Sequence, residues 1–183
     1  MQQYRILPGR FQPPHQDHVS LVESVLAESD QVLHVGIVFD SPGAADDPWF
    51  SRLNAEAKRQ HEPDRCPFTV TERLAMWRDI IDARALPASR LVLLALPRPE
   101  AAWQWITSLF PGRRTWIVPH AGEHFDDLKA EFFAAKGDRV DRPKQIPTTD
   151  GRIVRSLLDR PELSDHVLPG TAALVASIRK DTR

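Results

Sequence analysis

The sequence has little of several features that would point to an extracellular or membrane protein. Cys66 is the only cysteine in the 183 residues, which excludes an intrachain disulfide and is typical of a reducing compartment. The first residues lack the apolar run of a signal peptide. No stretch approaches the roughly 18 apolar residues that a membrane-spanning helix needs. We therefore expect a cytoplasmic protein with no membrane partner.

An excess of charge of one sign is also missing. The 24 lysines and arginines nearly balance the 25 aspartates and glutamates, which gives a formal net charge of -1 at pH 7. This balance gives no overall attraction for nucleic acids or anionic membranes. We expect no nucleic acid partner, and any phosphate binding must come from a local site.

The composition is typical of one globular domain. Hydrophobic residues make up 42% of the chain and charged residues 27%, and a chain of this length can bury a substantial core. We find no internal repeat, low-complexity tract or clear linker. We therefore predict a single domain over residues 1–183.

Short apolar runs alternate with helical patterns along the chain. The runs predict buried strands at residues 4–7, 32–39, 91–96 and 116–118. Six helical patterns lie between and after them; one begins with a capping box from Thr69 to Glu72, and another ends at Gly137. This alternation favours an α/β fold with a parallel sheet covered by helices on both faces. Ligands of such sheets bind beyond the carboxyl ends of the strands.

One polar segment interrupts the alternation. Residues 41–66 contain several prolines and acidic residues, and we expect a long loop there, with a short helix at about residues 50–59. Loops of this length are usually functional lids or disordered excursions.

The most informative motif follows the first predicted strand. Residues 9–18 are Gly-Arg-Phe-Gln-Pro-Pro-His-Gln-Asp-His, and they lead into the first predicted helix. A helix N-terminus attracts phosphate through its unpaired N–H groups and its partial positive charge. His15 and His18 can face the same side of that helix. Together with Arg10 they could hold a triphosphate and stabilise charge that develops on an attacked phosphorus.

Two other interpretations of the histidine pair stay open at this point. His15 and His18 could be a helix start and a surface histidine, which is the usual meaning of an isolated His-x-x-His pattern. They could also bind zinc, but no cysteine or glutamate ligand is nearby in the sequence. We therefore predict no metal site built from protein side chains.

The complete motif resembles the Gly-Arg-Phe-Gln-Pro-Phe-His-x-Gly-His signature of the nucleotidylyltransferases. Within that superfamily it most resembles the archaeal-type nicotinamide-mononucleotide adenylyltransferases and their bacterial relatives. The resemblance implies a Rossmann-like nucleotidylyltransferase fold and an enzyme that moves AMP from ATP to a phosphorylated acceptor. In that family the acceptor is nicotinamide mononucleotide, the products are NAD and pyrophosphate, and Mg2+ accompanies ATP. Relatives are commonly oligomeric, so the resemblance also implies a homo-oligomer.

Three later segments carry the same resemblance in the same order. Residues 65–73 are similar to Arg-Asn/Asp-Pro-Phe-Thr-x-x-Glu-Arg, residues 151–155 to Ser-Gly-Thr-x-Ile/Val-Arg, and residues 165–169 to a Leu-Val-Pro stretch before the last helix. The resemblance implies that Arg65 and Arg155 contact the phosphates of ATP. Arg73 follows the capping box, and we interpret it as a charge on the helix surface.

The predicted site combines residues from these segments. The expected catalytic residues are His15, His18, Arg10 and Arg65. The expected ATP-binding residues are Gly9, Arg10, Phe11, Gln12, His15, His18, Arg152 and Arg155. The expected acceptor-binding residues are Trp103, Phe68 and Asp40.

Trp103 matches the aromatic residue on which the family stacks the nicotinamide ring, and Trp105 is a second candidate. Stacking requires a flat, partly exposed ring. Trp103 also lies on the helical stripe of Ile106 and Phe110, so a place in the core is the alternative. The sequence does not decide between the two.

The sequence departs from the family mainly on the acceptor side. Residues 38–44 differ from the Ile-Gly-Ser-Ala stretch expected there, the following loop is longer, and residues 97–99 replace an expected Asp-Ile pair. In addition, Asp17 replaces the glycine between the two histidines. Its carboxylate would repel phosphate unless it caps the helix and faces away, or helps to hold a metal ion. Another acceptor, such as phosphopantetheine or a sugar phosphate, and a degenerate nucleotide-sensing protein remain alternatives.

Overall fold

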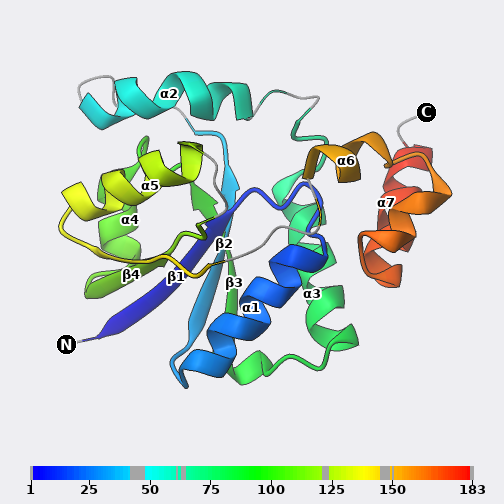
Figure 1. The fold of residues 1–183 in the computed structure, drawn as a ribbon, viewed down its shortest axis with the longest axis horizontal. Helices are drawn as coiled ribbons and strands as arrows, with labels where there is room; N and C mark the ends of the chain where they lie inside the picture. Colours follow the sequence, from blue (N-terminus) through cyan, green and yellow to red (C-terminus); the bar gives the residue numbers. More distant parts are fainter. Residues whose placement is uncertain are drawn as a thin grey trace.

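Five parallel strands form one sheet in the order β3-β2-β1-β4-β5, as the computed structural model shows (Figure 1). The structure describes residues 2–41, 48–60, 62, 65–120, 124–144, 149 and 151–181. The strands are β1 (Gln3–Gly9), β2 (Leu33–Phe39), β3 (Leu91–Pro97), β4 (Arg113–Ile117) and β5 (Arg139–Asp141). The predicted α/β class, the parallel sheet and the four predicted strands are confirmed. β5 was not predicted, because it has only three residues and two of them are charged.

Helices cover both faces of the sheet (Figure 1). One face carries α1 (Gln16–Glu28) and α3 (Val70–Ala83), and the other carries α2 (Pro48–Gln60), α4 (Trp103–Leu109) and α5 (His124–Ala135). Successive side chains of a strand point to opposite faces. Leu7 of β1 accordingly packs with α1 and α3, whereas Ile6 packs with α4 and α5. Burial on both faces explains why the strands are continuous apolar runs.

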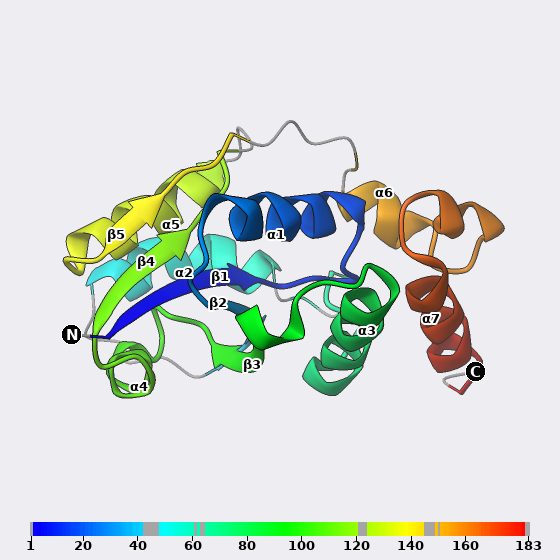
Figure 2. The same ribbon diagram turned by 90° about the horizontal axis from the view of Figure 1, so that it is seen from below.

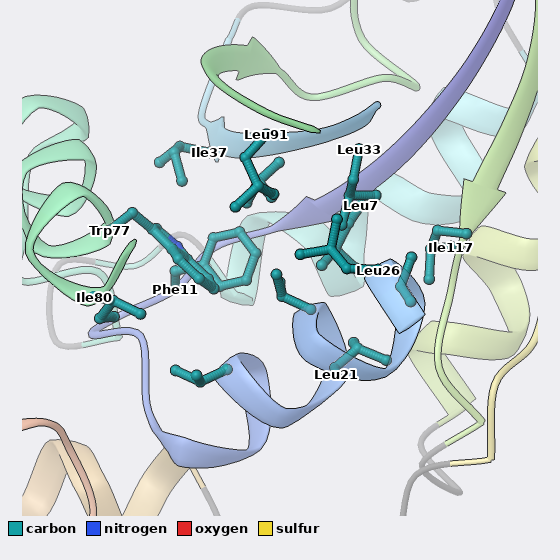
Figure 3. Packing of buried hydrophobic residues seen from close by; sticks show 14 residues of the cluster. Leu7, Phe11, Leu21, Leu26, Leu33, Ile37, Trp77, Ile80, Leu91 and Ile117 are labelled. Atoms are coloured by element: carbon teal, nitrogen blue, oxygen red, sulfur yellow. The ribbon is translucent and has the colours of Figure 1, made fainter. Parts of the chain in front are cut away.

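Aromatic contacts mark the two layers of the core. On the first face, Phe11 meets Trp77 edge to face, with ring centroids 5.0 Å apart, and Figure 3 shows both rings between α1 and α3. On the second face, Trp116 stacks on Phe133 with centroids 3.9 Å apart. Phe11 belongs to the loop after β1, so the first core layer extends to the carboxyl ends of the strands. This is the edge of the sheet at which α/β proteins generally bind ligands.

The C-terminal part of the chain packs beside α3 (Figure 2). It consists of α6 (Gly151–Ser156), a 3-10 turn (Pro161–Asp165) and α7 (Pro169–Asp181). A third apolar cluster joins these elements to α3; its members include Phe68, Met76, Val154, Val167 and Val175. The N–H of Gln16, at the start of α1, donates a hydrogen bond to the carbonyl of His166 at 3.1 Å. The C-terminal segment therefore lies next to the N-terminus of α1.

The segment in which we expected a long loop with a short helix contains one helix of 13 residues. α2 covers the short helix expected at residues 50–59 and begins at Pro48; residues 42–47 lie outside the described part of the chain. Leu53 is buried, and Trp49 lies against Phe132 of α5 with ring centroids 6.1 Å apart. These two apolar residues, four apart, lie on the face of α2 that packs on the sheet. None of the helices in the described ranges has the length and apolar character needed to cross a membrane.

The contact between α3 and α7 gives a prediction about stability. A Cβ atom added at Gly170, in the first turn of α7, would overlap the carboxylate of Asp79 on α3. The carboxylate must turn aside to admit the methyl group, which offsets the gain of up to about 1 kcal/mol that alanine brings to a helix. Gly170→Ala should therefore raise the free energy of unfolding more in an Asp79→Ala background than in wild type, because the two positions are coupled. Equal changes in both backgrounds, measured by chemical denaturation, would contradict this account of the helix contact.

Candidate active site

A cavity of about 660 Å³ opens at the carboxyl ends of the strands. Its walls come from the loop after β1, the start of α1, the ends of β2 and β3, α5, and Thr149 with the residues of α6. This position is where α/β sheets bind ligands, and the volume is within the range of small-molecule sites. All eight residues predicted to bind ATP line it: Gly9, Arg10, Phe11, Gln12, His15, His18, Arg152 and Arg155.

The loop after β1 is built as a rigid wall of this cavity. Phe11 has a φ of 52°, in the left-handed region, and its ring occupies the space where a side chain on Gly9 would lie. The buried amide of Gln12 pairs with the backbone of Phe68: its Nε2 donates to the carbonyl at 2.9 Å, and its Oε1 accepts from the N–H at 3.0 Å. Gly9, Phe11 and Gln12 therefore shape the loop through contacts within the protein.

Arg73 holds the same loop from the side of α3. Arg73 is 4% exposed, and its guanidinium donates to the carbonyls of Arg10 at 2.6 Å, Val38 at 2.8 Å and Thr69 at 3.1 Å. The interpretation of Arg73 as a surface charge is wrong, because its side chain turns inward to these carbonyl groups. Burial lowers the pKa of Arg73 to about 10, so it keeps its positive charge at neutral pH.

The two histidines meet at the first turn of α1. His15 is the N-cap residue, and its backbone N–H donates to Nδ1 of His18 at 3.2 Å; the two ring centroids are 3.8 Å apart. Because Nδ1 accepts, a neutral His18 carries its proton on Nε2. Burial, followed by the positive charges of His15, Arg10 and Lys129, lowers the pKa of His18 well below 6.5. His18 is therefore a neutral hydrogen-bond donor at pH 7.

Asp17 ties the start of α1 to the C-terminal segment. Its side chain is buried, and Oδ2 accepts a hydrogen bond from the N–H of Thr149 at 2.8 Å. A Cβ atom on Gly151 would lie 3.7 Å from Nε2 of His15 and 3.4 Å from Nη1 of Arg155. The carboxylate thus has a role that neither sequence interpretation considered: it holds the segment that carries Arg155 against the histidines.

The structure places Trp103, which is partly buried, against the core on the second face of the sheet. Its ring lies 5.3 Å from Phe132 and 6.2 Å from Trp116 between centroids, with the guanidinium of Arg114 5.3 Å from its own centroid. It is not among the described residues that line the cavity. These contacts match the alternative to stacking, since the stripe shared with Ile106 faces the sheet. Trp105 is 49% exposed on the outer side of α4.

Three other predicted residues also lie outside the described cavity wall. Phe68 is buried in the third apolar cluster. Arg65 lies in the turn before α3, where its N–H donates to the carbonyl of Glu62 at 2.9 Å. Asp40 accepts a hydrogen bond from Arg98 at 3.0 Å, and Arg98 does line the cavity. The roles proposed for Arg65, Phe68 and Asp40 stay predictions.

Charged residues that the sequence analysis did not assign also face the cavity: Arg98, Glu100, Asp126 and Lys129. Lys129 of α5 forms an ion pair with Asp126. An arginine between two prolines, directly after a buried strand, was the available signal for Arg98. Asp126 and Lys129 gave no such signal, because charged residues are common on any amphipathic helix.

The described residues contain no group of three or more His, Cys, Asp or Glu side chains arranged to hold a metal ion. A phosphate site in this cavity would depend on its nitrogen donors. These include the N-terminus of α1 and the side chains of Arg10, His15, His18, Arg152 and Arg155.

The pKa of His18 predicts a pH dependence of stability. The unfolded chain binds a proton near the ordinary pKa of 6.5, whereas the folded protein does so only at lower pH. The contribution of His18 to the free energy of unfolding is therefore lost as the pH falls below that value. The difference between wild type and His18→Gln should shrink from about pH 7.5 to about pH 5.5. NMR titration of the ring checks the pKa directly, and an ordinary value would contradict the geometry described above.

Comparisons with known proteins identify the family to which this chain belongs. The cytidylyltransferase-like family model matches residues 6–141. A nicotinamide-nucleotide adenylyltransferase of Pyrobaculum aerophilum is 27% identical over 177 residues, which cover 94% of this chain and 87% of the relative. The enzyme of the same name from Pyrobaculum arsenaticum is 31% identical over 101 residues, 55% of this chain and 46% of that one.

Two solved structures share the fold. A nicotinic acid mononucleotide adenylyltransferase of Plasmodium falciparum, complexed with APC, has a TM-score of 0.61 at 13% identity, covering 98% of this chain and 96% of that one. A bifunctional NMN adenylyltransferase/ADP ribose pyrophosphatase of Francisella tularensis also has a TM-score of 0.61, at 12% identity. That match covers 89% of this chain and 44% of the longer one. Because the family model spans most of the sheet and the site, the chain belongs to the cytidylyltransferase-like family.

Proposed function

We propose that this enzyme transfers the adenylyl group of ATP to nicotinamide mononucleotide, giving NAD and pyrophosphate. The observation that carries the proposal is the convergence of two histidines and three arginines around the N-terminus of α1, in one cavity. The names of the archaeal relatives support the acceptor. ATP and a small phosphorylated acceptor are then the partners of the site.

In the proposed reaction, a phosphate oxygen of the acceptor attacks the α-phosphorus of ATP. A new P–O bond forms on that phosphorus while the bond to the pyrophosphate oxygen breaks. The enzyme contributes positioning and electrostatic stabilisation. Nε2 of His18 donates a hydrogen bond to an oxygen of the reacting phosphate without losing its proton. The neutral state of His18 suits this role, because the donor is in place before charge develops.

The three arginines would bind the remaining phosphate oxygens. Arg10 comes from the loop after β1, whereas Arg152 and Arg155 come from the segment that Asp17 holds in place. Guanidinium groups can bind phosphate through two parallel hydrogen bonds. We expect Mg2+ to arrive with ATP as part of the substrate, since Mg2+ is usually held by phosphates and water with few protein carboxylates.

The position of Trp103 supports a second candidate function, in which the enzyme carries out the same adenylyl transfer to a different acceptor. A partly buried ring that packs against the core and lies outside the described cavity wall does not supply the expected stacking surface, so phosphopantetheine or a sugar phosphate would be the alternative acceptor. A nucleotide-sensing protein without activity would not need the arranged set of nitrogen donors. Measuring the reaction separates these possibilities.

The test is release of pyrophosphate from ATP and nicotinamide mononucleotide. We expect wild type to release it with formation of NAD, and His18→Ala to lower turnover by roughly 100-fold or more, since one such contact is worth about 2.7–4 kcal/mol in the transition state. Circular dichroism should show that the variant keeps its fold. Pyrophosphate release only with another acceptor would favour the second candidate. Wild-type turnover in His18→Ala would remove His18 from the mechanism.

Asp17 gives a separate prediction. Asp17→Gly removes the acceptor of the Thr149 N–H and should raise the KM for ATP by roughly tenfold, the scale of one charged hydrogen bond. Its magnesium requirement should stay that of wild type. Asp17→Asn should keep much of the ATP affinity, because its side-chain oxygen can accept the same hydrogen bond. A clear rise in the magnesium needed by Asp17→Gly would instead show that the carboxylate holds the metal.

A further inference from the structure

A cationic side chain of the cavity comes from an element outside the sequence motifs. Lys129 of α5 lines the cavity together with Phe125, Asp126 and Phe132. We propose that Lys129 is a catalytic residue, which donates a hydrogen bond to the phosphate under attack from the side opposite His18. This inference rests on the proposed function and adds a residue to the same site.

The topology brings Lys129 and His18 to the same end of the sheet from its two faces. β1 and β4 are neighbours in the sheet, and α1 follows β1 in the chain as α5 follows β4. The buried side chains of α1 belong to the first core layer, whereas those of α5 belong to the second. A phosphate at the carboxyl ends of these two strands can therefore be bound from both sides, by His18 on one helix and Lys129 on the other.

The electrostatics of His18 agree with this arrangement. Burial lowers the pKa of His18 most, and Lys129 is one of three residues whose positive charges lower it further. Such an effect weakens with distance, so the ammonium group lies close enough to His18 for one small anion to meet both side chains. The flexible four-carbon stem of a lysine also lets its charge follow a bound phosphate.

Two contacts hold Lys129 at the cavity. Its Nζ lies 2.5 Å from Oδ1 of Asp126, with side chains that are 27% and 12% exposed, and 5.0 Å from the centre of the Phe125 ring. An ammonium group has three N–H donors, and the carboxylate oxygen accepts one of them. The remaining donors can bind a ligand, while the ion pair reduces the repulsion between Asp126 and a triphosphate.

The contribution of Lys129 to the reaction is electrostatic. In the transition state the charge is spread over the non-bridging oxygens of the attacked phosphorus. Nε2 of His18 donates to one of these oxygens and Nζ of Lys129 to another, and both groups keep their protons. A contact that strengthens in the transition state raises kcat more than it strengthens substrate binding, so its loss lowers kcat with little change in KM.

The test measures pyrophosphate release from ATP and nicotinamide mononucleotide in wild type, Lys129→Met and Lys136→Met. Methionine removes the charge and has a helix propensity close to that of lysine. We expect kcat of Lys129→Met to fall by roughly 10- to 100-fold, the scale of one hydrogen bond to a charged group, with a much smaller change in the KM for ATP. Lys136 is the matched control: its Nζ lies 5.5 Å from the centre of the Phe132 ring, and it is not among the described residues that line the cavity. Lys136→Met should keep the kcat of wild type.

A double variant separates a contact with substrate from simple neutralisation of Asp126. If Lys129 only balanced the charge of that carboxylate, removing both charges in Lys129→Met/Asp126→Asn would restore the kcat of wild type. Because asparagine does not replace the missing donor to the phosphate, we expect the double variant to stay as slow as Lys129→Met. Circular dichroism checks that each variant is folded.

Unchanged kcat in a folded Lys129→Met would overturn the inference, and so would recovery of kcat in the double variant. An equal loss of kcat in Lys136→Met would overturn it as well, because the effect would then not depend on the cavity. In each of these cases wild type still releases pyrophosphate, so the proposed function stands. If wild type releases none, the proposed function fails, and the inference fails with it.

Discussion

The guanidinium of Arg73 connects the loop after β1 to β2 and to the start of α3. It does so through three carbonyl groups, those of Arg10, Val38 and Thr69. A buried charge is costly unless hydrogen bonds satisfy it, so the loop cannot move away from α3 without leaving this charge poorly paired. The wall of the cavity that carries Arg10 and Gln12 is consequently set by the packing of a helix outside the signature motif.

Similar hydrogen bonds join other distant parts of the chain beside the N-terminus of α1. The amide of Gln12 binds the backbone of Phe68, and Asp17 binds the N–H of Thr149. The N-terminus of α1 thereby contacts both the segment before α3 and the segment that carries Arg155. A triphosphate in this cavity would meet donors from the beginning and the end of the chain, so its binding would also hold the C-terminal segment to the sheet.

The sequence could predict which residues of the first motif lie at the cavity because short-range spacing determines their positions. The motif at residues 9–18 forms one loop and one helical turn, and its members line the cavity as expected. The acceptor side depends on long-range packing. The helical stripe of Trp103 has the same spacing whether the ring faces a ligand or the core, and only the place of α4 against Trp116 separates the two. The burial of Arg73 could not be predicted from the sequence either, because arginine in a helix is usually exposed.

The proposed function requires that a nucleoside triphosphate binds where the start of α1 meets Thr149 and α6. A crystal structure with a non-hydrolysable ATP analogue and Mg2+ tests this claim most directly. We predict that the phosphates lie against His18, Arg10 and Arg155, with Nε2 of His18 within hydrogen-bond distance of an α-phosphate oxygen. Phosphates bound away from the N-terminus of α1, or an α-phosphate out of reach of His18, would contradict the account.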